Sequence, residues 1–254
     1  MTVPAKPTSP QTYARFGGLL YLAIIVTGAL GELFIRGKLV VPGNAAATAS
    51  NILASETLWR LGIAGDLVMH VCDVFVMWAL YVLLRPVSRN VALLNLLLNL
   101  IQTAVLVANK LNLLVPLFLL GDAPYLKAFE PAQLQAWSYV AIRLHEYGFG
   151  VGLIFFGFVC LVEGHLIRKS GYLPRFLGML MQIAGTCYLI NSFALLLAPD
   201  FEGQLFPFIL MPCLIAELSL ALWLLVKGVN MQEWARHTGS ASVEGSPATS
   251  LCQG

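Results

Sequence analysis

The sequence predicts an all-α integral membrane protein, a polytopic bundle of about six transmembrane helices. Hydrophobic residues make up 58% of the 254 residues and charged residues only 11%, whereas soluble domains carry about 25% charged residues. The apolar residues gather into long runs, and a transmembrane helix needs about 20 mostly apolar residues. That pattern recurs six times along the chain. The net charge of +2 is too small to predict a nucleic-acid partner.

The spans are expected between short polar or proline-containing loops. Residues 1–11 are proline-rich and are expected to form a flexible tail. Residues 12–229 are expected to form the membrane domain, and the Gly/Ser/Thr-rich residues 230–254 a disordered tail. The six expected spans are residues 16–35, 58–84, 91–114, 137–167, 176–197 and 204–226.

Two loops carry local helix signals. Pro42-Gly43-Asn44 is typical of a turn, and Asn44 is a suitable cap for a short helix over residues 45–55. This segment is too polar to span, so it is expected at the surface or folded over the bundle. Pro131 after Glu130 indicates that the fourth helix begins at the membrane interface, since proline suits the first turn of a helix.

The distribution of lysine and arginine predicts the orientation, because short cytoplasmic loops are enriched in both. One side of the expected topology holds nine of them, and these are Lys6, Arg15, Arg85, Arg89, Arg168, Lys169, Arg175, Lys227 and Arg236. The other side holds three, which are Arg36, Lys38 and Lys127. Both termini are therefore expected in the cytoplasm.

Several stretches carry a family resemblance, and they are Ala14-Arg15, Gly17-Gly18-Leu19-Leu20-Tyr21-Leu22, Gly31-Glu32-Leu33-Phe34-Ile35-Arg36, Pro42-Gly43-Asn44-Ala45-Ala46-Ala47-Thr48-Ala49, Asn51-Ile52, Leu144-His145, Tyr147-Gly148 and Arg168-Lys169-Ser170-Gly171-Tyr172-Leu173-Pro174-Arg175. Over roughly residues 12–228 the chain resembles a bacterial family of multi-pass membrane proteins, domain of unknown function 4386. Asn44 departs from it, since the family leads us to expect aspartate there. The resemblance implies six spans in a cell inner membrane, but no activity, substrate or catalytic residue.

Polar side chains inside the expected spans are the candidate functional residues. Ionisable groups in hydrocarbon are costly and mark functional sites by default. Asp66, His70 and Asp73 share one helix face because their spacing is i, i+4, i+7. Such faces should converge rather than meet lipid, which predicts a polar cavity opening outward. Its candidate residues are Glu32, Arg60, Asp66, His70, Asp73, Asn99, Gln102, Arg143, His145, Glu146 and Glu217.

Pairing between these groups is a competing interpretation, in which they only tie helices together. Arg143 and Glu146 lie three residues apart and are expected to pair on one helix. Glu32 is a candidate partner for Arg60. Glu163 is expected at the cytoplasmic interface.

Aromatic residues near the expected span ends have a simple interpretation. Tyr21 and Trp59 are among them and are assigned to the interfacial belt.

A metal site is a weaker hypothesis, and no cofactor is expected. Asp66, His70, Asp73 and His145 offer imidazole and carboxylate ligands suited to a divalent ion such as zinc. The chain has no His-Glu-x-x-His, Gly-x-Ser-x-Gly or Walker motif.

Three function classes stay open. The first is a protein that binds or transports a small molecule through the outward polar cavity. The second is an intramembrane enzyme acting on a lipid or apolar substrate, with a carboxyl group as acid or base beside a histidine. The third is a structural or regulatory membrane protein. Membrane lipids and a small-molecule ligand are the expected partners, and the sequence does not decide whether the protein is an enzyme.

Overall fold

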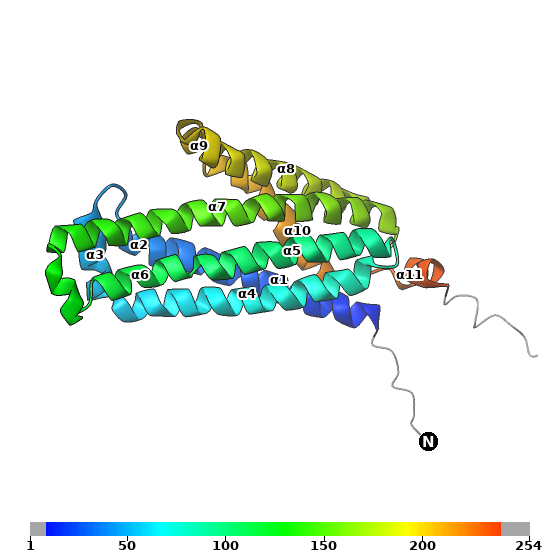
Figure 1. Cartoon of the computed structure of the whole chain (residues 1–254). Helices are drawn as coiled ribbons and strands as arrows, with labels where there is room; N and C mark the ends of the chain where they lie inside the picture. Colours follow the sequence, from blue (N-terminus) through cyan, green and yellow to red (C-terminus); the bar gives the residue numbers. More distant parts are fainter. Residues whose placement is uncertain (1–8, 240–254) are drawn as a thin grey trace, which may run out of the picture.

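The computed structural model describes residues 9–239, which form helices joined by short loops, with no strand among them (Figure 1). The helical elements in chain order are α1 (Pro10–Leu30), η1 (Gly31–Arg36), α2 (Gly37–Leu39), α3 (Ala45–Ala54), α4 (Glu56–Leu84), α5 (Arg89–Asn109), α6 (Leu111–Leu119), η2 (Pro124–Ala128), α7 (Pro131–Ser170), α8 (Arg175–Leu197), α9 (Pro199–Leu205), η3 (Phe208–Leu210), α10 (Met211–Val226) and α11 (Met231–Thr238).

Six helical stretches are long and apolar enough to cross a membrane, and they are Pro10–Leu39, Glu56–Leu84, Arg89–Leu119, Pro131–Ser170, Arg175–Leu197 and Phe208–Val226. The predicted all-α polytopic fold is therefore confirmed.

The bundle is elongated, and its two ends differ (Figure 1). The first residues of α1 lie at one end together with α11, and we call this the terminal end. The short helix α3 and the loop with η2 lie at the other end, which we call the loop end. The longest helix, α7, has 40 residues and so extends for about 60 Å. It packs against α5, α6 and α8, while α1 packs against α4 and α10.

Glycines bring α7 and α8 into close contact. A Cβ on Gly164 would lie 2.4 Å from the Gly178 carbonyl oxygen, and one on Gly185 would lie 2.6 Å from the Gly157 carbonyl oxygen. Small residues allow membrane helices to approach until their backbones touch. The tight α7–α8 pair is thus a consequence of two glycines on each helix.

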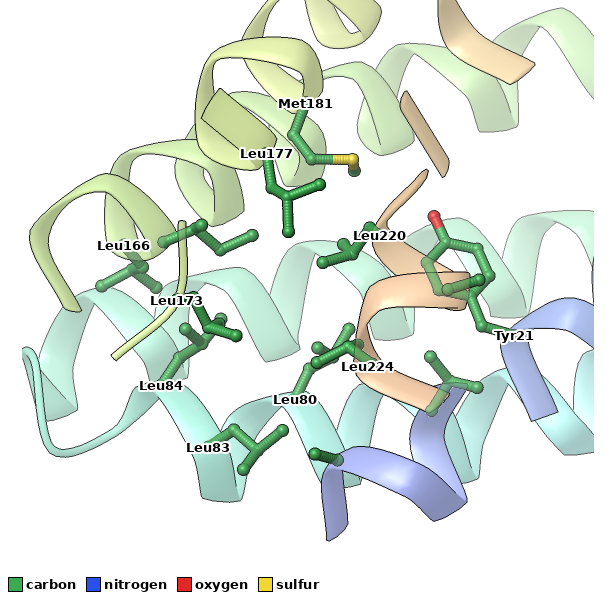
Figure 2. Packing of buried hydrophobic residues seen from close by; sticks show 14 of the residues in the cluster. Tyr21, Leu80, Leu83, Leu84, Leu166, Leu173, Leu177, Met181, Leu220 and Leu224 are labelled. Carbon is green, nitrogen blue, oxygen red and sulfur yellow. The ribbon is translucent and has the colours of Figure 1, made fainter. Parts of the chain in front are cut away.

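An apolar core fills the terminal-end half of the bundle (Figure 2). Leu84 of α4, Leu166 of α7, Leu177 of α8 and Leu224 of α10 meet there and are almost completely buried. Tyr172, in the turn between α7 and α8, donates a hydrogen bond to the Leu83 carbonyl. Burial raises the pKa of the Tyr172 phenol, so it stays neutral.

The predicted N-terminal tail is too long by at least two residues. Helix α1 begins at Pro10, and the Ser9 hydroxyl accepts a hydrogen bond from the Gln11 amide. The Gln11 side chain also donates to the Lys227 carbonyl at 2.9 Å and accepts from the Val229 amide at 3.0 Å. The start of the chain's first helix is thereby bound to the end of its last span. The predicted tail residues 1–8 lie outside the described residues.

The predicted sixth span and C-terminal tail also need correction. Residues 204 and 205 belong to α9, because Pro207 interrupts the chain and Phe206 before it is extended. After the span, α11 forms where disorder was predicted. The Asn230 side chain caps α11 by accepting from two amides, and Trp234 packs edge-on against Tyr172. Residues 240–254 of that tail lie outside the described residues.

The other predicted bounds differ by smaller amounts. The third span reaches Leu119 rather than residue 114, because Pro116 is accommodated inside α6. The fourth helix starts at Pro131, as the sequence predicts, with a capping box between Glu130 and Gln133. The predicted short helix after Asn44 is also confirmed, and α3 packs against α7 at the loop end.

Candidate functional site

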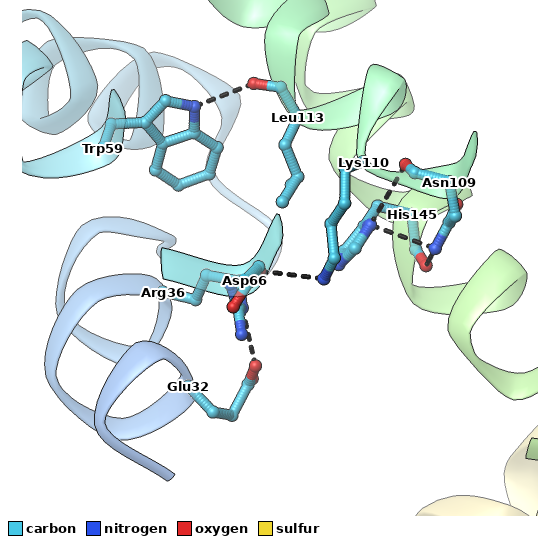
Figure 3. Close-up of polar contacts among 8 residues, drawn as sticks. All are labelled: Glu32, Arg36, Trp59, Asp66, Asn109, Lys110, Leu113 and His145. Carbon is cyan, nitrogen blue, oxygen red and sulfur yellow. Dashed lines mark hydrogen bonds and ion pairs between the residues drawn. The ribbon is translucent and has the colours of Figure 1, made fainter. Parts of the chain in front are cut away.

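The candidate site is a set of charged side chains where η1, α4 and the α5–α6 junction meet (Figure 3). Asp66 comes from α4, Arg36 ends η1, and Lys110 stands between α5 and α6. Glu32, one turn before Arg36, completes what we call the ion-paired cluster. The loop-end halves of three spans therefore supply it.

One carboxylate oxygen receives both cations of this cluster. The Asp66 Oδ2 atom accepts from Arg36 Nη1 at 2.7 Å and from Lys110 Nζ at 2.8 Å. Asp66 is 3% exposed and Lys110 is 4% exposed. Arg36 also donates from Nε to the exposed Glu32 carboxylate at 2.7 Å. Asp66 and Lys110 are thus buried together, Arg36 is half-buried beside them, and the second carboxylate lies at the rim.

The backbone around Arg36 is unusual. Residues Gly31–Arg36 form a π-helical segment within the first span. Such segments are rare and occur frequently at functional sites. Gly31 allows the close approach, since a Cβ there would lie 3.2 Å from Asp66 Oδ1 and 3.4 Å from Arg36 Nη2.

A second group of contacts joins α5 to α7 next to Lys110. Asn109 Nδ2 lies 3.0 Å from His145 Nδ1 and donates to the His145 carbonyl at 2.8 Å (Figure 3). Gly148 makes room for this, because a Cβ there would lie 2.2 Å from Asn109 Oδ1. Both Asn109 and His145 are buried.

The cluster borders a narrow hollow that is too small to admit a water molecule. Arg36 lines it together with Ile35, Trp59, Gly62, Ile63 and Leu113. Trp59 was assigned to the interfacial belt, but it is 1% exposed and donates to the Leu113 carbonyl at 2.8 Å. Its indole therefore forms a wall of the hollow.

A different group of carboxyls occupies the bundle interior. Asp73 of α4, Glu163 of α7 and Glu217 of α10 interact electrostatically with one another, and we call them the acid cluster. Among residues 9–239, none of the ion pairs includes any of the three.

Each member of the acid cluster has different neighbours. Asp73 accepts from the Thr103 hydroxyl. Glu217 accepts from the phenols of Tyr21 and Tyr188.

Glu163 was expected at the interface, yet it is 3% exposed because α7 continues to Ser170 and packs along α8. Asn95 of α5 interacts with its carboxyl group.

The candidate residues predicted from the sequence do not form one site and are divided between the two clusters and other positions. Asp66, Glu32 and His145 lie in or beside the ion-paired cluster. Asp73 and Glu217 belong to the acid cluster.

Gln102 accepts from Thr103 at 3.3 Å. His70 and Asn99 are buried, and His70 Nε2 and Asn99 Oδ1 have no hydrogen-bond partner within the part of the chain described.

Three of the candidates belong to neither cluster. Arg143 and Glu146 form the predicted pair on α7, with half-exposed side chains. The suggested pairing of Glu32 with Arg60 is wrong, because Arg60 binds Glu56 one turn away on α4.

The four-residue metal site considered from the sequence is not assembled. Across residues 9–239, no three His, Cys, Asp or Glu side chains are placed to hold a metal ion together. Asp66 is occupied by its two cations and Asp73 by Thr103, while His145 contacts Asn109.

Sequence reasoning left four important residues out of the site. Arg36 was counted as a loop residue, and Lys110 was not among the candidate residues. A buried Asp66 requires a cation, and that requirement was the available signal. Glu163 and Tyr21 lie near span ends in the sequence, and nothing there indicates that they are buried.

Comparison with known protein families gives one match. A family model described as "Domain of unknown function (DUF4386)" matches residues 16–228. The chain belongs to this family. The match covers most of the first span, the other five spans and both clusters, so both clusters are features of the DUF4386 domain of this chain.

A DUF4386 chain of this kind has a recognisable relative among curated proteins. A protein from Archaeoglobus fulgidus, named "Uncharacterized protein", is 32% identical over 171 residues, which is 67% of this chain and 86% of the relative. No solved structure matches the chain. The comparisons therefore give this DUF4386 protein a family but no activity.

Proposed function

We propose that the protein binds a small anion, with a carboxylate or phosphate group, at the ion-paired cluster. We place it in the cell inner membrane with both termini in the cytoplasm, so that the loop end faces outward. The imbalance of nine to three in Lys and Arg between the two sides supports this orientation. The cluster then lies in the outer half of the bundle, where a solute from outside would reach it.

The observation that carries the proposal is the sharing of Asp66 Oδ2 by Arg36 and Lys110. A buried charge is normally compensated by a partner. Here the buried Lys110 and the half-buried Arg36 share one buried carboxylate, and the carboxylate that balances the second cation, Glu32, is exposed to solvent, so the buried part of the cluster has more positive than negative charge. A bound anion would compensate that excess.

Unused donors on the same two residues support an anion rather than a neutral solute. An ammonium has three donors and a guanidinium five. Within residues 9–239, Lys110 Nζ donates one hydrogen bond, to Asp66. Within the same residues, Arg36 donates from Nε and Nη1 only. Arg and Lys are the side chains that recognise carboxylate and phosphate.

The cluster is closed to a ligand in this structure, and its opening would require a change in the neighbouring backbone. The hollow beside Arg36 is too narrow in this structure to admit a water molecule. Ile35 and Arg36 of the π-helical segment Gly31–Arg36 form one wall of it. A return of that segment to regular α-helix would shift Arg36 and widen the hollow. We infer that the structure is the closed form of the site.

The test is thermal unfolding of the full chain in phospholipid-free detergent with inorganic phosphate or acetate, at constant ionic strength set by chloride. A ligand at 100 times its Kd stabilises by about 2.7 kcal/mol, so a rise in Tm is expected. Lys110→Met should abolish the rise while keeping the fold, because Asp66 retains Arg36. Lys127→Met is the control, since Lys127 is exposed at the same end of the bundle.

A second arm distinguishes a free solute from a lipid headgroup. Phosphatidylglycerol is added to the micelles in place of phosphate. A Lys110-dependent rise with the lipid alone identifies a headgroup site, and a rise with phosphate or acetate identifies a solute site. Equal responses of wild type and Lys110→Met to all three anions would contradict the proposal and favour a purely structural cluster.

A further inference from the structure

The acid cluster is a separate feature that anion binding does not explain. Its three carboxyls come from the membrane-spanning helices α4, α7 and α10, where Glu163 is buried and Asp73 and Glu217 are partly buried. A charged side chain at the centre of a bilayer costs about 2.5–3.5 kcal/mol on translocon scales. Three carboxylates interacting without a cation would repel one another as well. Some positive charge must therefore accompany them.

Within residues 9–239, none of the side chains that interact with the cluster is a cation. They are Tyr21 from α1, Asp73 from α4, Asn95 and Thr103 from α5, Cys160 and Glu163 from α7, Tyr188 from α8, and Cys213 and Glu217 from α10. Two of the three acids have hydroxyl donors. Glu217 accepts from two phenols and Asp73 from Thr103. Glu163 has no such donor and differs from the others in this respect.

Two acceptor atoms at Glu163 lack a donor. Glu163 Oε1 and Asn95 Oδ1 are both buried without a hydrogen-bond partner among residues 9–239. Glu163 is 3% exposed and Asn95 is 7% exposed, and the two side chains interact. Leaving a buried acceptor unsatisfied costs about 1–3 kcal/mol. The amide of Asn95 interacts with the Glu163 carboxyl group, but among residues 9–239 it leaves Glu163 Oε1 and its own Oδ1 without a hydrogen donor.

We propose that Glu163 is a proton-binding site inside the membrane, with Asn95 as its positioning residue. A proton taken from water forms an O–H bond at Glu163 Oε1, which then donates to Asn95 Oδ1. On release that O–H bond breaks and the proton returns to water. One proton removes a buried charge and satisfies both orphan acceptors.

A proton fits this site better than a metal ion. A sodium or divalent ion takes several oxygens at once, and no three acidic, histidine or cysteine side chains in residues 9–239 are placed to share a metal. A proton needs a single pair of atoms. Exchange is reasonable from the terminal end, because Glu163 lies seven residues before Ser170 at the end of α7, about 10 Å along the helix.

The experiment is difference infrared spectroscopy of the full-length protein in nanodiscs during a pH titration. Wild type is expected to show the C=O band of a protonated carboxylic acid that disappears as the pH rises. Glu163→Gln should remove this band, while Glu146→Gln, on the half-exposed side of the same helix, should keep it. Asn95→Ala should keep the band and move it to higher frequency, because the acid loses its hydrogen-bond acceptor.

Two results would overturn the inference. One is a titrating band that is unchanged in Glu163→Gln, and the other is a band that responds to sodium at constant pH. The Asn95→Ala spectrum keeps the test decisive if Glu163→Gln does not fold. Glu163→Gln should also retain the anion-induced rise in Tm, so that failure of one proposal is distinguishable from failure of the other.

Discussion

Asp66 and Asp73 lie two turns apart on the same face of α4, but the charges that surround them differ. Asp66 is held by Arg36 and Lys110 from two neighbouring spans. Asp73 accepts a hydrogen bond from the Thr103 hydroxyl and interacts electrostatically with two other carboxyl groups. One carboxylate is therefore compensated by charge, and the other lies in a group that no side-chain cation compensates.

The difference separates two kinds of buried polar group. In the ion-paired cluster, every charge depends on its partners, and removal of one leaves the others uncompensated. In the acid cluster, replacing an acid by a neutral amide removes an unfavourable charge. We expect stability to depend strongly on the first group and weakly on the second.

The largest effect is expected from Asp66→Asn, which leaves Arg36 and Lys110 buried without their shared carboxylate. Breaking a buried pair by removing one partner costs about 3–5 kcal/mol. Reversible unfolding of the ligand-free protein in mixed micelles measures the loss. Glu56→Gln is the control on the same helix, since the Glu56–Arg60 pair is exposed and should contribute about 0–1 kcal/mol.

Asn109→Ala should have the next largest effect. It removes the contacts of Asn109 Nδ2 with His145 Nδ1 and with the His145 carbonyl. A buried polar group left unsatisfied costs about 1–3 kcal/mol. The same unfolding assay applies, and a loss as large as that of Asp66→Asn would contradict the ranking by charge.

Arg143→Gln should change stability by about 0–1 kcal/mol, because exposed ion pairs contribute little. The Arg143–Glu146 pair is half-exposed on α7. Its small effect should also shrink further at high salt. A salt-independent loss would mean that this pair is shielded by a neighbouring molecule or by lipid.

The smallest effect is expected from Glu163→Gln, with a free energy of unfolding close to that of wild type at neutral pH. The amide keeps the size of the side chain and adds a donor for the Asn95 oxygen. A large destabilisation would show that Glu163 is charged and compensated, which would contradict its assignment to the group of carboxyls without a compensating cation. Unfolding at several pH values checks this directly.

Much of this arrangement could be predicted from the sequence, and the reasons for the failures are physical. Apolar run lengths determine the spans, and the i, i+4, i+7 spacing places Asp66, His70 and Asp73 on one face. Pairing between helices depends on rotation and depth, which runs of apolar residues do not specify.

Arg36 shows this most clearly. The π-helical segment carries it to Asp66 and leaves Glu32 one turn behind, so the predicted Glu32–Arg60 pair does not form. Similarly, the length of α7 and its contact with α8 bury Glu163. Neither effect is visible from the local sequence.

The most direct test of the central claim is the response of Asp66→Asn to inorganic phosphate, measured as the rise in Tm over the same protein without phosphate. If Arg36 and Lys110 bind an anion, loss of the Asp66 carboxylate increases the excess positive charge, and the phosphate-induced rise should be larger than in wild type. A rise equal to or smaller than that of wild type would contradict the account and indicate that the two cations serve only to hold Asp66.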